Sequence, residues 1–167
     1  SISSRPAFFG PSEFIDLIHR IQLDITGAEI SFTAPLSFDT EIKEGPIYVS
    51  EMFKLYRYEN LLYTMTMTGK EIYGFLEPSY AIWTNHMKSE NDNLLLLRKE
   101  ENMRSGRLLN PFYNFDSAAG IVYTVDVSKP AGDRVTIMSM YDGSPFLEDK
   151  TYKVAINSYR GNGGGEH

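Results

Sequence analysis

The sequence predicts an α+β protein in which helices come first and short strands follow. Two early segments carry apolar residues at helical spacing, and three later segments have the alternation and β-branched content of strands. The turn sequences KPAGD and YDGS separate the later strands. Helices mixed with strands and followed by a meander of strands are typical of the α+β class.

The first predicted helix runs from Pro11 to Leu23, with Pro11 and Ser12 suited to its first turn. Its apolar residues recur every three or four positions. Thr26 and Gly27 interrupt this pattern, and the β-branched and aromatic run from Glu29 to Thr33 is predicted to form a strand that ends before Pro35.

A second helix is predicted to begin at Ser50, with the serine hydroxyl as its cap, and to end near Glu59. The segment LLYTMTMTG that follows alternates like a strand. Thr68 and Glu71 then have the spacing of a capping box, in which each side chain satisfies an unpaired backbone N–H. Ile72, Phe75, Leu76 and Tyr80 recur helically after this box, which predicts a third helix.

The second half of the chain is predicted to contain a long loop and three strands. Residues 88–110 are polar and lack clean periodicity, which favours a loop, and long ordered loops often carry function. The predicted strands are Gly120 to Val127, Arg134 to Met140 and Tyr152 to Ser158. A glycine cluster from Gly161 to Gly165 follows the last of them.

Length and composition favour one folded domain over residues 1–167. A chain of 167 residues can bury roughly 70% of its unfolded surface, and 42% hydrophobic with 23% charged residues is ordinary for a globular protein. The net charge of -6 is scattered, so no nucleic-acid partner is expected. No apolar run is long enough to span a membrane, and without cysteine neither the cytoplasm nor the periplasm is excluded.

The chain lacks the residue patterns of a hydrolytic centre. Its three histidines, His19, His86 and His167, lie far apart, with no second ligand at a metal-binding spacing. There is no nucleophile elbow, phosphate-binding loop or dinucleotide fingerprint. We therefore expect no metal site, no cofactor and no catalytic residue within this chain.

Two aromatic residues beside small ones, Phe115 in NFDSAAG and Tyr159 in NSYRGNGGG, are candidates for binding a flat ring. Each aromatic stack on a base contributes about 1–3 kcal/mol. The alternative is that both are core residues, as most of the 10 phenylalanines and 11 tyrosines should be. The glycine cluster is likewise either a flexible turn or a loop that lets the backbone approach a ligand.

Several segments together resemble the 5'-nucleotidase C-terminal domain. They are ITGAEISFTAPLSF leading to YVSEMFKLYRYENLLYTMTMTGKEI, then NFDSAAGIVYTVDVSKPAGDRV, and finally YKVAINSYRGNGGG, in the order of the family. The resemblance is greatest to the bacterial 2',3'-cyclic-nucleotide 2'-phosphodiesterase/5'-nucleotidase group. It implies layered sheets with flanking helices, in a domain that binds the nucleoside of the substrate.

The resemblance also implies the rest of the enzyme and its location. A calcineurin-like metallophosphoesterase domain, absent from this chain, would precede it and carry a pair of divalent metals such as Zn, Mn or Mg. The partners implied are that domain and a nucleotide or nucleoside. The function implied is phosphoester hydrolysis in nucleotide catabolism, in the periplasm, outside the cell or at its surface.

Site residues follow from the same resemblance. Phe115 and Tyr159 match the two base-stacking aromatics, and Ser117 matches a polar contact to the base edge. The glycine loop would add Asn162, Gly163 and Gly164 to the substrate-binding residues.

The chain departs from the family at two places. Phe32 to Ser37 reads FTAPLS where typical members carry an Asn-Gly-Gly-Gly-x-Arg motif, so the arginine fork for phosphate is missing. Gly165 stands where an acidic residue is usual. These departures keep an alternative open, in which the domain is a noncatalytic binding or packing module that kept the fold and lost phosphate recognition.

Overall fold

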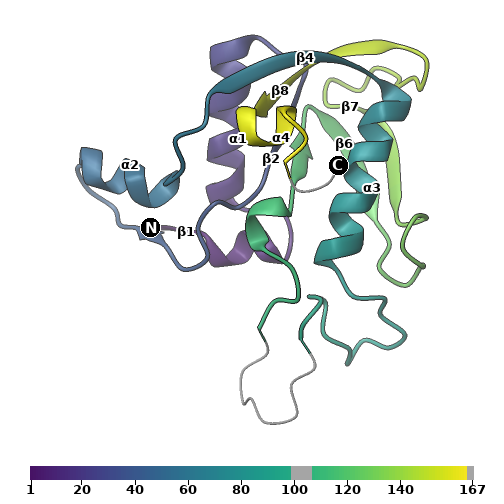
Figure 1. Cartoon of the computed structure of the whole chain (residues 1–167), viewed down its shortest axis with the longest axis horizontal. Helices are drawn as coiled ribbons and strands as arrows, with labels where there is room; N and C mark the ends of the chain where they lie inside the picture. Colours follow the sequence, from purple (N-terminus) through teal and green to yellow (C-terminus); the bar gives the residue numbers. More distant parts are fainter. Residues whose placement is uncertain (99–106, 165–167) are drawn as a thin grey trace.

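A four-stranded sheet with the strand order β4-β8-β2-β5 forms the centre of the molecule (Figure 1). It is seen in a computed structural model that describes residues 1–98 and 107–164. The strands are β2 (Ile30–Thr33), β4 (Leu62–Thr68), β5 (Ser117–Ala119) and β8 (Thr151–Asn157). β2 and β8 are parallel, and the other two pairs are antiparallel.

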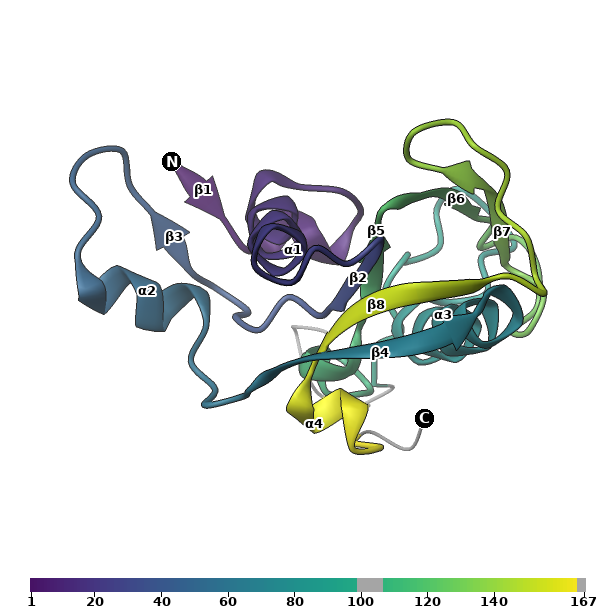
Figure 2. The same cartoon turned by 90° about the horizontal axis from the view of Figure 1, so that it is seen from above.

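Helices α1 (Glu13–Thr26) and α3 (Gly69–Trp83) cover different faces of this sheet (Figure 2). Every residue of β2 is buried, as expected for a strand covered on both faces. Ile30 and Phe32 of β2 join the hydrophobic cluster that includes α3. Ser31, which points the other way, contacts the side chain of His19 on α1. The alternation along this one strand therefore separates an apolar interior from a polar contact with α1.

Two hydrophobic clusters stabilise the fold. The larger one lies between the central sheet, α3 and the hairpin formed by β6 (Ile121–Val125) and β7 (Val135–Met140). The smaller one joins α1 to the N-terminal elements, which are β1 (Ile2–Ser3), β3 (Glu41–Ile42) and the 3-10 turn η1 (Arg5–Phe8). The remaining elements are α2 (Val49–Leu55), the 3-10 turn η2 (Phe112–Asn114) and α4 (Ser158–Gly161).

The predicted α+β class and the two long helices are confirmed. Ser12 caps α1 by accepting a hydrogen bond from the Ile15 backbone N–H, and Gly27 ends the helix in the left-handed conformation. The capping box of α3 is present in both directions between Thr68 and Glu71. The predicted strands at 29–33, 61–69, 134–140 and 152–158 correspond to β2, β4, β7 and β8 with shifted ends.

One local prediction is wrong, and two others hold only in part. Tyr48, rather than Ser50, occupies the N-cap of α2, and its side chain makes no capping bond. The predicted strand from Gly120 is shorter, because Gly120 adopts φ +93 between β5 and β6. A Cβ at Gly120 would overlap the Glu29 carbonyl oxygen, so this crossing of chains requires glycine. In the predicted loop, the described parts contain two isolated bridges, Thr84 with Leu95 and Leu97 with Leu108.

Candidate functional site

Two partly exposed tyrosine rings meet at the surface beside the end of β8. Tyr113 lies on η2 and Tyr159 on α4, and the green turn of η2 lies next to α4 in Figure 2. The ring centroids are 6.3 Å apart, with the planes at 81°. Tyr113 is 36% and Tyr159 42% exposed, so both rings retain surface that a ligand could contact. A third tyrosine, Tyr58, packs against Tyr113 with a centroid distance of 6.2 Å.

The short helix α4 sets the direction of Tyr159. The Asn157 side chain caps this helix by accepting a hydrogen bond from the Arg160 backbone N–H at 2.9 Å. The backbones of Ser158 and Leu61 are also linked, because the Ser158 N–H donates to the Leu61 carbonyl at 2.7 Å. The turn that carries Tyr159 is thus tied to the start of the β4 edge strand.

Gly164 packs directly against the Tyr159 ring. Its backbone N–H donates to the Tyr159 carbonyl at 2.8 Å. A Cβ at Gly164 would lie 2.7 Å from two carbon atoms of the Tyr159 ring, closer than real contacts allow. Gly163 takes φ +82, and Asn162 is exposed beside it. Within the glycine loop, Gly164 therefore supports the ring, while Asn162 and Gly163 are exposed.

A buried ion pair joins the two segments that carry these tyrosines. Its members follow the tyrosines in the sequence, Asp116 three residues after Tyr113 and Arg160 one residue after Tyr159. Arg160 Nη2 and Asp116 Oδ2 are 2.6 Å apart, and both side chains are 0% exposed. Burial raises the pKa of the Asp116 carboxyl to about 6, although the attraction of Arg160 acts in the opposite direction. Asp116 Oδ1 and Arg160 Nε find no hydrogen-bond partner among the described residues.

Phe115 is not a ligand-facing ring in this structure, which corrects the predicted pairing with Tyr159. Its side chain is fully buried and stacks on Trp83, with centroids 5.5 Å apart and planes at 6°. Its edge contacts Phe8 at a centroid distance of 6.5 Å. The physical reason is that the apolar interior takes the phenylalanine, while Tyr113, two residues earlier, keeps its ring at the surface.

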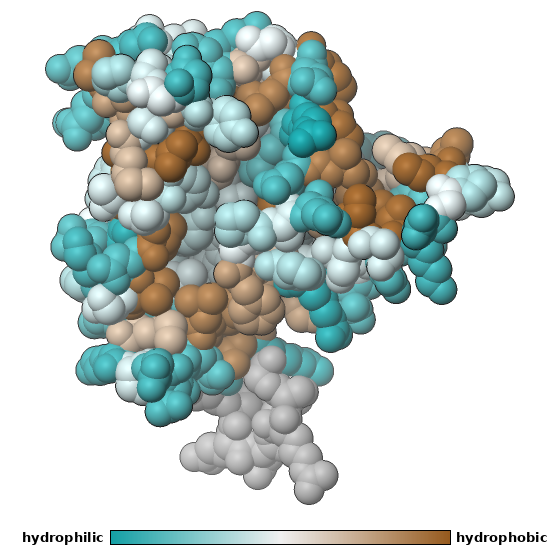
Figure 3. Space-filling view, turned by 180° about the vertical axis from the view of Figure 1, so that it is seen from behind, coloured by the Kyte–Doolittle hydropathy of each residue, from teal (hydrophilic) through white to brown (hydrophobic). Residues whose placement is uncertain are grey.

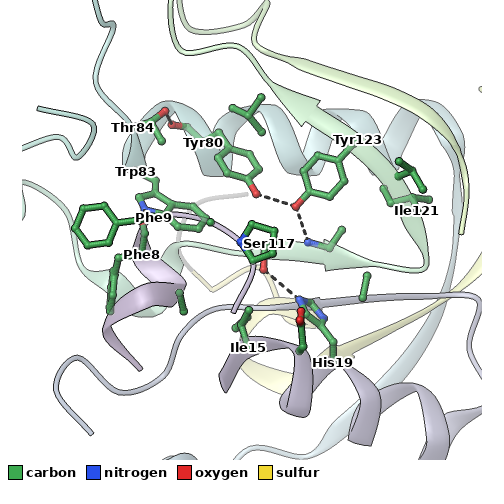
Figure 4. A pocket seen from close by; sticks show the side chains of 18 of the residues that line it. Phe8, Phe9, Ile15, His19, Tyr80, Trp83, Thr84, Ser117, Ile121 and Tyr123 are labelled. Atoms are coloured by element: carbon green, nitrogen blue, oxygen red, sulfur yellow. Dashed lines mark hydrogen bonds between the residues drawn. The ribbon is translucent and has the colours of Figure 1, made fainter. Parts of the chain in front are cut away.

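Ser117 lines a pocket that does not include Tyr159. This pocket has a volume of about 550 Å³ and lies between η1, α1, the end of α3 and β5–β6 (Figure 4). The Ser117 hydroxyl is 3.1 Å from His19 Nε2, and His19 Nδ1 is 2.9 Å from the Ser31 hydroxyl. The aromatic walls include Phe8, Phe9 and Trp83.

In this pocket His19 lies between the hydroxyls of Ser31 and Ser117, as a general base would beside a serine nucleophile, but His19 is too weak a base for that role. Burial lowers the pKa of His19 to about 3. A base with so low a pKa takes a proton from a serine hydroxyl very poorly, since an effective general base has a pKa near the working pH. His19 is therefore a neutral hydrogen-bonding group that joins α1 to β2 and β5.

The segment from Phe32 to Ser37 offers no surface for phosphate. Phe32 and Thr33 are 0% exposed, and Ser37 is 1% exposed. The Ser37 hydroxyl donates to the Lys54 carbonyl. The Ser37 hydroxyl is thus satisfied within the protein and does not point to solvent.

The described residues hold no cluster of three histidine, cysteine, aspartate or glutamate side chains that could bind a metal ion. His19 uses both ring nitrogens in the contacts given above, and His86 Nε2 lies 2.9 Å from the Ser128 carbonyl oxygen. His167, the third histidine considered in the sequence, and Gly165 lie outside the described residues.

This fold, a mixed four-stranded sheet with helices on its two faces, is that of the C-terminal domain of 5'-nucleotidases. The family model for the 5'-nucleotidase C-terminal domain matches residues 1–167. The chain belongs to this family.

Curated relatives agree with this family. The trifunctional nucleotide phosphoesterase protein YfkN of Bacillus subtilis is 31% identical over 140 residues, which are 77% of this chain and 9% of the relative. A 2',3'-cyclic-nucleotide 2'-phosphodiesterase/3'-nucleotidase of Salmonella typhimurium is 29% identical over 142 residues, which are 78% of this chain and 20% of the relative. The chain thus spans a fifth or less of the length of these two relatives.

Solved structures support the fold. A putative 5'-nucleotidase from Staphylococcus aureus, in complex with alpha-ketoglutarate, superimposes with a TM-score of 0.75 at 22% identity, covering 98% of this chain and 29% of that one. A 5'-nucleotidase precursor from Thermus thermophilus gives a TM-score of 0.61 at 24% identity, covering 90% of this chain and 25% of that one.

Proposed function

We propose that this chain is the nucleotide- or nucleoside-binding specificity domain of a metal-dependent 5'-nucleotidase or cyclic-nucleotide phosphodiesterase. The observation that carries the proposal is the contact between the half-exposed rings of Tyr113 and Tyr159. Relatives named as nucleotide phosphoesterases and cyclic-nucleotide phosphodiesterases supply the substrate class.

The tyrosine pair replaces the predicted pair of Phe115 and Tyr159 in this proposal. A base held between two parallel rings needs them about 7 Å apart, twice the contact distance of carbon atoms. The centroids are already 6.3 Å apart, so rotation of one ring with a small separation admits a planar guest. Asn162 and Gly163 are exposed in the turn that follows Tyr159, and in this proposal the Asn162 side chain contacts the sugar or the base edge.

The hydrolytic step belongs to another part of the enzyme in this proposal. The described residues lack a donor set for the divalent metal pair, so we derive no catalytic step here. That pair, Zn, Mn or Mg, would be held by an N-terminal metallophosphoesterase domain. The aromatic pair would position the base so that the phosphoester reaches those metals, which is how remote binding energy lowers a barrier.

We propose a periplasmic, extracellular or cell-surface location, by analogy with the enzymes that the family resemblance implies. Among the residues that the structure describes, no helix is long and apolar enough to cross a membrane. The partners proposed are a small nucleotide or nucleoside and the metallophosphoesterase domain.

A second candidate function, a noncatalytic packing or binding module, is favoured by the apolar arm that carries α2. Ile47, Tyr48, Val49 and Phe53 are each at least 65% exposed. This arm projects from the body in Figure 2 and shows hydrophobic patches in Figure 3. An exposed apolar patch of this kind marks an interaction surface. The two functions are separated by ligand binding, because a packing module has no need of the tyrosine pair.

Titration calorimetry with adenosine and AMP tests the first function. We expect saturable binding, and we expect Tyr113→Ala and Tyr159→Ala each to weaken it by about 1–3 kcal/mol, which is roughly 5- to 150-fold, because each removes one stack. Tyr113→Phe and Tyr159→Phe keep the rings and should bind nearly as well as wild type.

The matched control is Tyr141→Ala, since Tyr141 is 82% exposed and lines the pocket of Ser117 instead. Its affinity should equal that of the wild type. Adenosine binding that survives both alanine replacements in the tyrosine pair would rule out the proposed site.

A further inference from the structure

The Asp116–Arg160 ion pair links the two segments that carry the tyrosine pair. Tyr113 is three residues before Asp116, and Tyr159 immediately precedes Arg160. The contact of 2.6 Å between Nη2 and Oδ2 is buried completely on both sides. It is thus a direct connection between α4 and the segment that joins η2 to β5.

Each member of the pair is also fixed to other parts of the molecule. Ser79 on α3 donates its hydroxyl to the Asp116 backbone carbonyl at 2.8 Å. Arg160 Nη1 donates to the Gly164 carbonyl at 2.6 Å, and Gly164 lies against the Tyr159 ring. The guanidinium centre lies 5.4 Å from the centroid of the Phe75 ring. The charges are therefore held in one place rather than sampling several.

Net stability is a poor explanation for this pair. Moving two charges into the interior costs several kcal/mol per ion, and apolar residues of similar volume are often as stabilising or more so. Here the cost is visible, because burial shifts the pKa of Asp116 upward despite Arg160. Two polar atoms of the pair also lack hydrogen bonds among the described residues. In some proteins a buried pair serves instead to fix the relative position of the elements that it joins.

We infer that Asp116 and Arg160 are positioning residues, whose ion pair holds the rings of Tyr113 and Tyr159 next to each other, in the arrangement from which rotation of one ring admits a planar base. The inference rests on the proposed function for its consequence, which is ligand affinity. Its structural content, the placement of the two rings, is measurable without a ligand.

The test compares the 167-residue chain with the double variant Asp116→Val/Arg160→Met, which replaces the pair by apolar side chains. We expect a melting temperature close to that of the wild type, loss of the nuclear Overhauser contacts between the two tyrosine rings, and adenosine affinity lower by about 5- to 150-fold, the effect of losing one stack. Contacts between Tyr80 and Tyr123, whose hydroxyls are 2.7 Å apart, are the internal control and should persist.

Arg160→Lys is the second variant and carries the test if the double variant does not fold. It keeps the charge, but a single ammonium group lacks the fork that contacts both Asp116 and the Gly164 carbonyl. We expect a folded protein with weakened ring contacts and reduced affinity. Retention of both the ring contacts and the adenosine affinity, in either folded variant, would overturn the inference.

The outcomes separate this inference from the proposed function. If wild type binds no adenosine, the proposed function fails, and the ring contacts alone decide whether the pair positions the tyrosines. If Tyr159→Ala weakens binding while the folded double variant binds like wild type, the function stands and the positioning role is wrong.

Discussion

Asp116 is a carboxylate whose ionisation costs the fold free energy. Its pKa is about 6 in the folded protein, against 3.8 for a free aspartate side chain, because burial outweighs the attraction of Arg160. A group with a raised folded pKa contributes stability below its unfolded pKa and loses that contribution as pH rises through its folded pKa. Tyr56 and Tyr80 also sense the charge of Asp116, which raises the pKa of each of these hydroxyls, although burial is the larger cause in both.

We therefore predict that the free energy of unfolding of the wild type, minus that of Asp116→Asn, falls between about pH 4 and pH 7. A rise in pKa from 3.8 to about 6 corresponds to a fall on the order of 3 kcal/mol. Urea denaturation at a series of pH values measures both proteins, and the subtraction removes the titration of other carboxylates. A difference that stays constant, or that grows with pH, would contradict the burial argument.

Phe115 gives a second prediction at the same scale. Because its ring is fully buried and stacked on Trp83, Phe115→Ala should lower the free energy of unfolding by about 3–5 kcal/mol, the usual cost of emptying a phenylalanine site. Phe115→Leu should cost less and should leave adenosine affinity near that of the wild type. Loss of binding in a well-folded Phe115→Leu protein would return this ring to the ligand site.

Among the elements, those with local signals were predictable and those formed by distant contacts were not. The capping box at Thr68 and the cap at Ser12 mark α3 and α1 within a few residues of sequence. The turn α4 has no such signal beyond Asn157, and it is fixed by Arg160 reaching Asp116, a contact made across the fold.

The residues of the candidate site are also difficult to predict from sequence, because their orientation depends on contacts between distant segments. The segment PFYNFD contains three aromatics, and their spacing does not reveal which of them faces the interior. The sequence therefore favours Phe115 as the ligand-facing ring, whereas the structure buries Phe115 and leaves Tyr113 exposed. The one sequence signal that favours Tyr113 is its hydroxyl group, since a tyrosine often keeps its polar end at the surface.

The α4 turn and its glycines yield a prediction at the scale of the element. Gly164→Ala should displace Tyr159, because the new methyl group would overlap the Tyr159 carbonyl oxygen and would lie 2.7 Å from the ring. Adenosine binding should weaken by roughly fivefold, equal to losing part of one stack, with little change in melting temperature. Gly74→Ala is the matched control, since a Cβ at Gly74 has nothing within 4 Å. Equal affinities for the two variants would show that the ring position does not depend on Gly164.

At the scale of the whole molecule, the polar interior serves to connect elements. His19 joins α1 to two strands, and Glu77 of α3 accepts backbone hydrogen bonds from Arg134 at 2.8 Å and Val135 at 2.7 Å beside the β6–β7 hairpin. The Asp116–Arg160 pair joins η2 to α4. Histidine, carboxylate and guanidinium groups take part in catalysis in many enzymes. In this chain the ones named above are buried and make hydrogen bonds or ion pairs between elements of the fold.

This use of the polar residues predicts that the chain alone hydrolyses no phosphoester. With Mn, Zn or Mg added, we expect AMP, 2',3'-cyclic AMP and bis(p-nitrophenyl) phosphate to remain intact, because the described histidines are engaged within the fold and no acidic cluster joins them. Phosphate release and nitrophenolate absorbance measure the reaction, with His19→Ala as a control for adventitious metal binding. Metal-dependent turnover that follows the protein through purification, and that His19→Ala abolishes without unfolding the chain, would place the chemistry in this domain.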